Sequence, residues 1–304
     1  MPFVFTRRHE LLHYINEQKE KQQSIGFVPT MGALHAGHAQ LIRQSCELNN
    51  STIVSIFVNP KQFGPNEDYA NYPRTFQNDL DLITEIGAQA VFAPSVEEMY
   101  PQRFSTQVSV SGISEVLCGA FRPGHFNGVT NIVLLLMNLM QADTMYLGQK
   151  DFQQVQVIKK MVTDLAHPTK IVMVPTVREA DGLAMSSRNR YLTDTARKKA
   201  AIIPRALALV AKEYLAGETA VSSLLHLCLQ ELKKFDLEPQ YLEFRKVSDL
   251  TQKCQNRLEE ETVLAIAQFI ESNDTKVRLI DNIILDNNST NKLSLEEFIS
   301  RALS

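Results

Sequence analysis

The sequence has few cysteines, and none is placed for a disulfide framework or a metal site. Its four cysteines, Cys46, Cys118, Cys228 and Cys254, lie far apart and form no Cys-x-x-Cys pair. Isolated thiols of this kind are typical of proteins in a reducing compartment. We therefore expect reduced thiols in a cytoplasmic protein.

Long apolar runs and an excess of one charge are also missing. The strongest run, Ile132–Met137, extends only to Met140, whereas a bilayer-spanning helix needs roughly 20 apolar residues. The N-terminus lacks the apolar core of a signal peptide. Lysine and arginine number 31 against 34 acidic residues, a formal charge of −3. These features give no indication of a membrane or nucleic-acid surface.

Short apolar runs alternate with helix-like segments through about residue 175. The run Thr52–Val58 is almost entirely β-branched or aromatic, which suits a strand that is covered on both faces. Such alternation is typical of a doubly wound parallel sheet in an α/β protein. The alternating segment 107–111 predicts an edge strand. The other expected strands are 25–28, 90–93, 144–147 and 170–174.

The pattern changes in the last part of the chain, where helices are grouped before strands. This grouping is typical of a smaller α+β domain. We expect domains at 1–176 and 177–304, with a linker at 286–292 and a short amphipathic helix at 294–303 as a tail after residue 285. The helices expected before it are 193–216 and 222–235, and the strands are 241–247, 262–270 and 277–285.

The stretch Phe27–His38 has the composition of an anion-binding turn. An apolar strand meets Pro29 and Gly32, and His35-Ala-Gly-His38 then leads into a helix. Backbone N–H groups at a helix N-terminus favour anions. Two imidazoles three residues apart can share one helix face and reach one phosphate. The alternative interpretation is a pair of ordinary surface histidines.

Three later segments offer further groups for such a site. The irregular segment 61–74 follows a candidate parallel strand, where ligands of α/β proteins bind. Lys150 follows another strand, at the start of a helix. Met185-Ser-Ser-Arg188 supplies hydroxyls and a guanidinium, which binds phosphate in a bidentate manner. Taken singly, the lysine fits a solvated loop residue and the serine loop fits a polar hinge.

The combination of these motifs is more specific than any one of them. A His-x-Gly-His turn with a late Met-Ser-Ser-Arg loop is the paired signature of enzymes that attack the α-phosphate of ATP and release pyrophosphate. The second loop resembles the Lys-Met-Ser-Lys-Ser loop of class I aminoacyl-tRNA synthetases. Arginine stands here in place of its last basic residue.

Six motifs in order extend the resemblance over residues 1–285. The chain resembles the pantothenate synthetase (pantoate–β-alanine ligase) family. The motifs are Pro29-Thr-Met-Gly-Ala-Leu-His-x-Gly-His38, Phe57-Val-Asn-Pro-x-Gln-Phe63, Tyr72-Pro-Arg-Thr75, Arg122-Pro-Gly-His-Phe-x-Gly-Val129, Gly148-x-Lys-Asp-x-Gln-Gln154 and Asp181-Gly-Leu-Ala-Met-Ser-Ser-Arg-Asn189.

This resemblance implies a Rossmann-like nucleotidyltransferase fold, with a catalytic domain that binds ATP and pantoate and a C-terminal lid domain. It implies nucleotide contacts from Met31, Gly32, Ala33, Leu34, His35, Ala36, Gly37, His38, Gly148, Gln149, Lys150, Asp151, Val177, Met185, Ser186, Ser187 and Arg188. The residues implied in catalysis are His38, His35, Lys150, Ser186, Ser187 and Arg188. Pantoate or β-alanine would contact Gln62, Gln154, Asn59 and Arg122. Mg²⁺ would bind to the phosphates and would contact Asp79 through a water molecule.

The resemblance further implies ATP-dependent condensation of (R)-pantoate with β-alanine through pantoyl adenylate, with release of AMP and diphosphate, in coenzyme A biosynthesis. The expected partners are these small molecules and a second copy in a homodimer, without nucleic acid or membrane. Two departures are Gln149, where glutamate is usual, and the tail after Leu285. The alternatives are a nucleotidyltransferase acting on a phosphorylated acceptor and a non-catalytic nucleotide-binding protein.

Overall fold

The structure, a computed structural model, describes residues 1–65, 67–273, 275–286 and 289–303. The chain divides into two compact units. The first unit comprises Met1–Glu115 and Gly119–Pro175, and the second comprises Val116–Cys118 and Thr176–Ser304. Each unit has its own sheet and its own apolar core.

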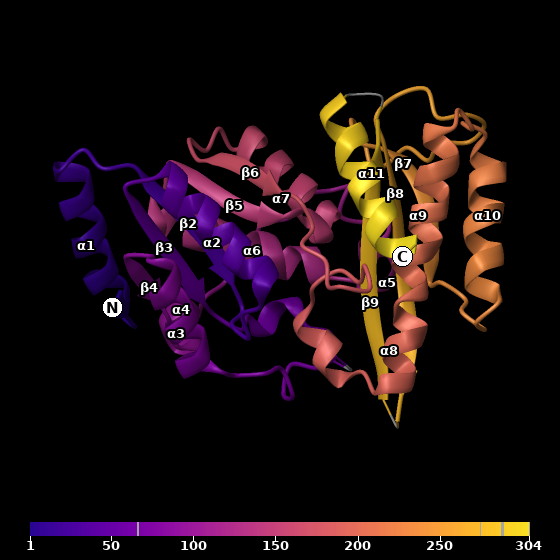
Figure 1. Cartoon of the computed structure of the whole chain (residues 1–304). Coiled ribbons are helices and arrows are strands. Elements are labelled where there is room, and N and C mark those ends of the chain that lie inside the picture. Colours follow the sequence, from indigo (N-terminus) through magenta and orange to yellow (C-terminus); the bar gives the residue numbers. More distant parts are fainter. Residues whose placement is uncertain (66, 274, 287–288, 304) are drawn as a thin grey trace. The chain divides into compact units, whose positions relative to one another are not determined.

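A parallel six-stranded sheet forms the centre of the first unit (Figure 1), which confirms the predicted α/β fold. Its strand order is β1-β4-β3-β2-β5-β6, and every neighbouring pair is parallel. Strand β1 was not expected, because three residues are too few to show a periodicity. The strands are β1 (Phe3–Phe5), β2 (Ile25–Thr30), β3 (Ser51–Ile56), β4 (Ala90–Phe92), β5 (Thr144–Gly148) and β6 (Lys170–Val174).

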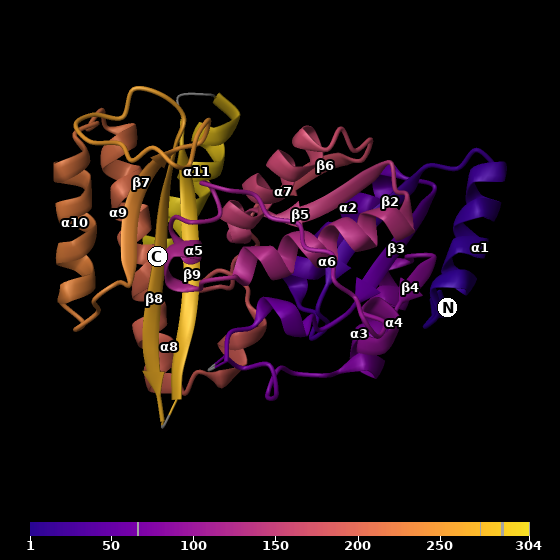
Figure 2. The ribbon, with the colours of Figure 1, turned by 180° about the vertical axis from the view of Figure 1, so that it is seen from behind.

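Helices cover both faces of this sheet, as the apolar run in β3 predicts. Val28 and Val54 pack with Ile42 and Ile83, which come from α2 (Ala36–Leu48) and α3 (Phe76–Ile86). The opposite face is covered by α1 (Arg8–Glu20), α6 (His125–Met140) and α7 (Phe152–Asp164), as Figures 1 and 2 show. The short helices are α4 (Val96–Met99) and α5 (Cys118–Phe121), with single turns η1 (Pro60–Gln62) and η2 (Gln149–Asp151).

The edge strand predicted at 107–111 is absent from this described segment, so that prediction was wrong. Side chains of α6 satisfy its backbone in place of a neighbouring strand. The Thr130 hydroxyl donates to the Val108 carbonyl at 2.6 Å, and Val108 N–H donates to Asn131 Oδ1 at 3.2 Å. The alternating pattern at 107–111 therefore belongs to a segment that lies against helix α6.

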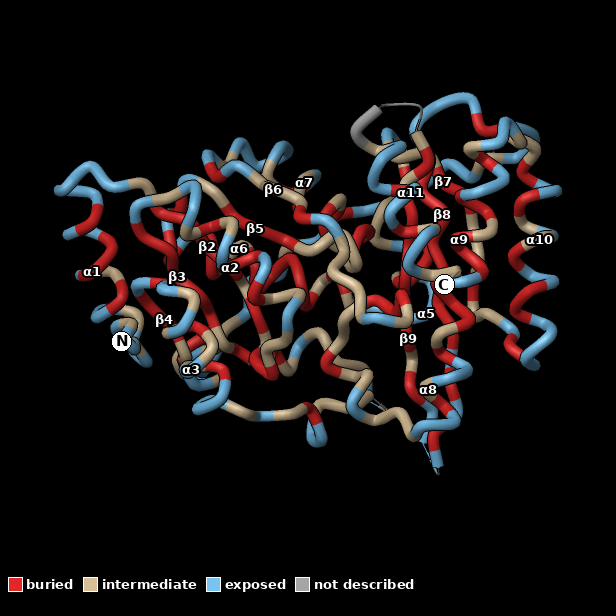
Figure 3. Tube along the Cα trace, in the orientation of Figure 1, coloured by how far each residue is buried: buried red, intermediate tan, exposed pale blue. Residues whose placement is uncertain are grey.

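The second unit is an antiparallel sheet of β7 (Tyr241–Lys246), β8 (Thr262–Ser272) and β9 (Thr275–Leu285) with helices on it. Its strands are largely buried (Figure 3). The predicted helix 193–216 is two helices, α8 (Asp194–Ala200) and α9 (Ile202–Leu215). Pro204 explains the break, because it has no N–H to donate to the Ala200 carbonyl. The single turn η3 (Ser187–Tyr191) and helix α10 (Val221–Lys233) complete this part.

The terminal helix α11 (Ser289–Leu303) begins earlier than the predicted residue 294. The predicted linker 286–292 was therefore wrong for residues 289–292, and residues 287–288 lie outside the described part. Asn291 Nδ2 donates to the Ile284 carbonyl at 2.9 Å, which ties the first turn of the helix to β9. No helix among the described residues has the length and apolar character needed to cross a membrane.

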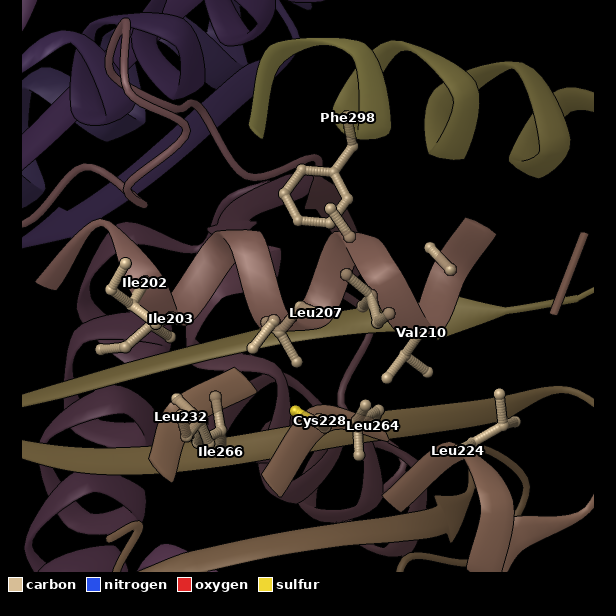
Figure 4. Packing of buried hydrophobic residues seen from close by; sticks show 14 of the residues in the cluster. Ile202, Ile203, Leu207, Val210, Leu224, Cys228, Leu232, Leu264, Ile266 and Phe298 are labelled. Carbon is tan, nitrogen blue, oxygen red and sulfur yellow. The ribbon is translucent and has the colours of Figure 1, made fainter. Parts of the chain in front are cut away.

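Leu207 of α9 lies at the centre of the core that Figure 4 shows, with its side chain fully buried. We predict that Leu207→Ala lowers the free energy of unfolding by about 2–5 kcal/mol, since it loses apolar burial and leaves a cavity. Leu229→Ala, at a position that is 43% exposed on α10, should change it by less than about 0.5 kcal/mol. Urea unfolding measures both, and equal midpoints would contradict this packing.

Candidate functional site

The turn after β2 takes a left-handed backbone at two successive residues. Gly32 has φ +79° and Ala33 has φ +51°. The Thr30 hydroxyl accepts from Gly32 N–H at 3.2 Å and donates to the Ser55 carbonyl at 2.7 Å. A non-glycine residue reaches this conformation only when its surroundings hold it there. Ala33 therefore needs a partner that fixes its peptide.

Asp79, from the first turn of α3, is that partner. Its Oδ2 accepts from Ala33 N–H at 2.9 Å, and its Oδ1 accepts from Leu34 N–H at 2.8 Å and from the Thr75 hydroxyl at 3.1 Å. The residue is only 2% exposed. Both carboxylate oxygens thus hold the turn directly, and a water-mediated contact of Asp79 with Mg²⁺ stays a prediction.

His35 and His38 lie together where this turn enters α2. Their ring centroids are 4.0 Å apart, and His35 caps the helix by accepting from Gly37 N–H at its Nδ1, at 3.1 Å. His38 Nδ1 is buried and has no hydrogen-bond partner among the described residues. Burial, then the nearby charges of His35 and Lys150, lower the pKa of His38 well below its ordinary value. His38 is accordingly a neutral imidazole at neutral pH.

Lys150 comes from η2, the single turn that follows β5. Strands β2 and β5 are parallel neighbours, so the segments that follow them meet at one edge of the sheet. Its Nζ is 3.4 Å from Asp151 Oδ2. Because the Lys150 charge lowers the pKa of His38, the structure brings the predicted lysine and the histidine turn together.

Asn59 and Gln62 form a buried polar link beside the same turn. Asn59 Nδ2 donates to Gln62 Oε1 at 3.0 Å and to the Gly128 carbonyl at 3.1 Å, while its Oδ1 accepts from the Tyr100 hydroxyl at 2.8 Å. Gln62 Nε2 lies 3.0 Å from the sulfur of Met31. A Cβ on Gly128 would lie 2.2 Å from the Lys61 carbonyl oxygen, so only glycine permits this approach.

Arg122 belongs to a clasp that comprises Glu67, Arg122 and His125. Arg122 Nε and Nη2 each lie 2.6 Å from an oxygen of Glu67, and Nη1 lies 3.0 Å from His125 Nε2. His125 Nδ1 lies 2.8 Å from the Gln62 carbonyl oxygen. That oxygen can only accept, so Nδ1 carries the proton and Nε2 accepts from Arg122. The clasp thus fixes the backbone of Gln62.

The clasp also sets the protonation of its members. Burial alone would raise the pKa of Glu67, but the hydrogen bonds and charge of Arg122 lower it to about 2. Burial and then the Arg122 charge lower the pKa of His125 to about 4. At neutral pH, Glu67 is therefore ionised and His125 is neutral, which are the protonation states that these hydrogen bonds require. Direct contact of Arg122 with a substrate stays a prediction.

Gln154 lies in the first turn of α7 and is half-buried. Its neighbour Gln153 is buried and donates to the Ile113 carbonyl at 2.8 Å. Within the described residues, the side chain of Gln154 makes no hydrogen bond with Gln62 or Asn59. Its substrate contact therefore stays a prediction from the resemblance.

In the second unit, residues 177–185 form a tight hairpin that leads into Met185–Arg188. Met185 N–H donates to the Val177 carbonyl at 2.9 Å. Arg197 closes the hairpin from α8, since its guanidinium lies 2.7 Å from Glu179 Oε2 and 2.8 Å from Asp181 Oδ2. Val177 and Met185, two predicted nucleotide contacts, are thereby neighbours.

The serine segment that follows the hairpin starts the single turn η3. Ser186 caps this turn, because its hydroxyl accepts from Arg188 N–H at 3.3 Å. Ser187 is 9% exposed. Asn189 Nδ2 donates to Glu179 Oε1 at 2.6 Å and to the Ala184 carbonyl at 3.0 Å, which anchors the end of the segment on the hairpin. Ser186–Arg188 thus form the cap and start of η3, and Met185 is the last residue of the hairpin.

The donors of the first unit fit a polyphosphate. The helix N-terminus of α2, the imidazoles of His35 and His38, and the Lys150 ammonium supply N–H groups and positive charge. His38 Nδ1, a buried nitrogen without a partner among the described residues, is the kind of group that a ligand can satisfy. The described residues contain no group of three or more His, Cys, Asp or Glu side chains placed for a metal. Mg²⁺ commonly binds through substrate phosphates and few protein ligands, so this result is compatible with it.

Several partners in this site were not anticipated from the sequence. They are the amide contacts of Asp79, the links made by Tyr100, and the pairing of Glu67 with Arg122 and His125. Asp79 is 46 residues from Ala33, and Glu67 is 55 residues from Arg122. The only local signal was Asp79 in the first turn of α3. An acidic residue at that position is ordinarily explained by its favourable interaction with the helix dipole.

Comparisons with known proteins agree with the motifs. A family model described as pantoate–β-alanine ligase matches residues 3–284. The pantothenate synthetase of Carboxydothermus hydrogenoformans is 49% identical over 284 residues, which cover 93% of this chain and 98% of that protein. The pantothenate synthetase of Moorella thermoacetica is 46% identical over 277 residues, covering 91% and 96%.

Solved structures show the same likeness. Pantothenate synthetase from Thermus thermophilus has a TM-score of 0.85 and 39% identity, covering 92% of this chain and 98% of that one. Pantoate–β-alanine ligase from Francisella tularensis, complexed with "Beta-gamma ATP" and β-alanine, has a TM-score of 0.72 and 34% identity, covering 93% and 97%.

The hydrogen bonds of Asp79 predict a loss of ATP affinity in Asp79→Asn. The substitution removes the charge and turns one acceptor oxygen into a donor that faces Ala33 or Leu34 N–H. We expect ATP to bind roughly tenfold more weakly by calorimetry, with or without Mg²⁺, since a charged hydrogen bond is lost. Asp81→Asn, exposed on the same helix, is the control. Equal affinities would contradict the role of Asp79 in holding the turn.

The lowered pKa of His125 predicts a dependence of stability on pH. Its pKa falls from 6.5 in the unfolded chain to about 4, so its contribution is present above about pH 6.5 and is lost as the pH falls towards 4. His125→Asn keeps a donor for the Gln62 carbonyl and removes this titration. Between pH 7.5 and 4.5 the wild type should lose on the order of 2 kcal/mol more unfolding free energy than the variant. His13→Asn, at an exposed site on α1, should behave as wild type, and equal losses in all three proteins would refute the assignment.

Proposed function

The chain belongs to the pantoate–β-alanine ligase family, and we propose that it makes pantothenate through a pantoyl adenylate and releases AMP and diphosphate. The ligase activity itself rests on the family match over residues 3–284 and on relatives that are 42–49% identical over most of the chain. The adenylate route is supported by one observation above all. The His35 and His38 rings lie 4.0 Å apart at the start of α2, and Lys150 is near enough for its charge to lower the pKa of His38, a grouping that suits a polyphosphate.

The first step joins two anions, so charge must be neutralised where they meet. The pantoate carboxylate oxygen attacks the α-phosphorus of ATP, and the bond from that phosphorus to the leaving diphosphate oxygen breaks. Charge grows on phosphoryl oxygens during this exchange. His38 and His35 donate N–H groups and Lys150 supplies a fixed positive charge, without reorganisation at the moment of reaction. Mg²⁺, when bound to the phosphates, would neutralise part of the same charge.

The remaining groups orient the acid and release the diphosphate. Gln62 and Gln154 bind pantoate, and Gln62 then meets β-alanine. Asn59 fixes the Gln62 amide, and Arg122 fixes its backbone through His125. Ser186, Ser187 and Arg188 hold the departing diphosphate, while Val177 contacts the adenine. The β-alanine amine attacks the acyl carbon, and AMP leaves with the bridging oxygen.

The domain roles belong to the same proposal. Pantoyl adenylate is a mixed anhydride that water would hydrolyse, so an enzyme must exclude water until the amine attacks. We assign catalysis to residues 1–176 and a lid function to residues 177–304. Formation of a homodimer and a cytoplasmic location remain expectations, which sedimentation and cell fractionation measure.

The test is a product assay with a histidine variant. Purified protein with ATP, Mg²⁺, D-pantoate and β-alanine should yield one AMP for each pantothenate, and no AMP when pantoate is replaced by a phosphorylated acceptor. His38→Ala should lower kcat/KM by roughly 100-fold or more, because a positioned donor to the transition state is lost. His9→Ala, exposed on α1, should match the wild type. Release of ADP, or full activity in His38→Ala, would overturn the proposal.

A further inference from the structure

Helix α11 lies beyond the part of the chain that the family model matches. That match ends at residue 284, and the helix spans Ser289–Leu303. It is nevertheless packed into the second unit, because Leu295 and Phe298 are 4% and 8% exposed within the core of α9 and the sheet. Figure 4 shows Phe298 pointing from α11 towards α9. A segment that the rest of the family's pattern does not include is thus an integral part of this unit.

The C-terminal half of α11 also contacts the hairpin that carries the predicted nucleotide segment. The guanidinium carbon of Arg178 lies 4.1 Å from the centre of the Phe298 ring. Arg301 Nη1 donates to the Arg178 carbonyl at 3.3 Å. A Cβ on Gly182 would lie 3.1 Å from the Cα and Cβ of Ala302. Phe298, Arg301 and Ala302 therefore meet the first limb and the turn of one hairpin.

Arg178 is held equally firmly from its other side. Its Nη1 and Nη2 lie 2.7 and 2.9 Å from the two carboxylate oxygens of Asp281 on β9, and Nη1 donates to the Gly182 carbonyl at 3.0 Å. The side chains of Arg178 and Asp281 are 8% and 2% exposed. A buried arginine of this kind needs all its partners to remain satisfied. The Asp281 carboxylate binds the edge of the guanidinium, whereas the Phe298 ring lies against one of its faces.

The backbone pairs of the hairpin connect Arg178 to Met185, where the predicted nucleotide segment begins. Arg178 pairs with Ala184 across the hairpin, and Met185 N–H donates to the Val177 carbonyl. Residues Val177 and Met185 are therefore placed by the same contacts that α11 stabilises. The segment 185–188 begins where the braced part ends.

We propose that α11 is a brace for the triphosphate-binding segment, with Phe298 and Arg301 as positioning residues that act through Arg178. The inference rests on the proposed function of Met185–Arg188. A segment that is ordered before the ligand arrives binds it more tightly, because less conformational entropy is lost on binding. If a smaller fraction of the molecules holds the binding-competent conformation, the apparent dissociation constant rises in inverse proportion to that fraction. The brace thus acts on the affinity for the polyphosphate of ATP.

Two pairs of matched variants in the full chain test this brace. Phe298→Leu keeps an apolar side chain in the core but removes the ring over Arg178, and Leu295→Val is its control in the same core. Arg301→Ala removes the bond to the Arg178 carbonyl, and Lys292→Ala removes an exposed charge from the other end of α11. Melting temperatures of each pair show whether a variant is merely unfolded.

Phe298→Leu and Arg301→Ala should raise the KM for ATP roughly fivefold, as a fivefold smaller competent fraction requires. Their KM for β-alanine should stay at the wild-type value. Backbone amides of residues 177–188 should exchange hydrogen faster in these two variants than in the wild type. In the controls, the exchange rates of the same amides should be unchanged. Equal ATP KM values and equal exchange in variants and controls would overturn the brace, even with an active wild type. A wild type that makes no pantothenate would instead refute the proposed function, while the exchange measurement would still test the brace.

Discussion

The candidate site of the first unit depends on one carboxylate that binds backbone amides. The turn after β2 leads into the helix that carries His35 and His38, and it takes a left-handed backbone at Ala33. The buried Asp79 carboxylate stabilises this conformation, because it accepts hydrogen bonds from the N–H groups of Ala33 and Leu34. Both oxygens of this carboxylate are thus engaged by groups of the fold.

A second set of polar groups, buried or partly buried, surrounds Gln62, a predicted substrate contact. Asn59 bonds the side chain of Gln62, and the clasp of Glu67, Arg122 and His125 bonds its backbone carbonyl. Such networks are costly when one member is lost and specific when all are present. Gln62 is thus fixed through both its side chain and its backbone. Met31 connects it to the turn after β2.

Local patterns were enough to predict much of this molecule. The apolar runs predicted five of the six parallel strands, and the histidine turn and Lys150 were identified from their places after two of those strands. The amide contacts of Asp79 and the clasp were out of reach, because their partners are about fifty residues apart and share no local pattern. Alternation at 107–111 misled the prediction, since it reflects packing against Thr130 and Asn131. The early start of α11 was missed because its first turn is polar and because the bond from Asn291 to β9 leaves no local pattern in the sequence.

In the proposed route, a pantoate oxygen becomes bonded to the α-phosphorus of ATP. An isotope transfer experiment measures this bond most directly. Pantoate labelled with ¹⁸O in its carboxylate is converted with ATP, Mg²⁺ and β-alanine, and the AMP is analysed by mass spectrometry. If pantoyl adenylate forms, each AMP carries one ¹⁸O atom, because the bridging oxygen leaves with the phosphate when the amine attacks the acyl carbon. Unlabelled AMP formed together with pantothenate would contradict the adenylate route.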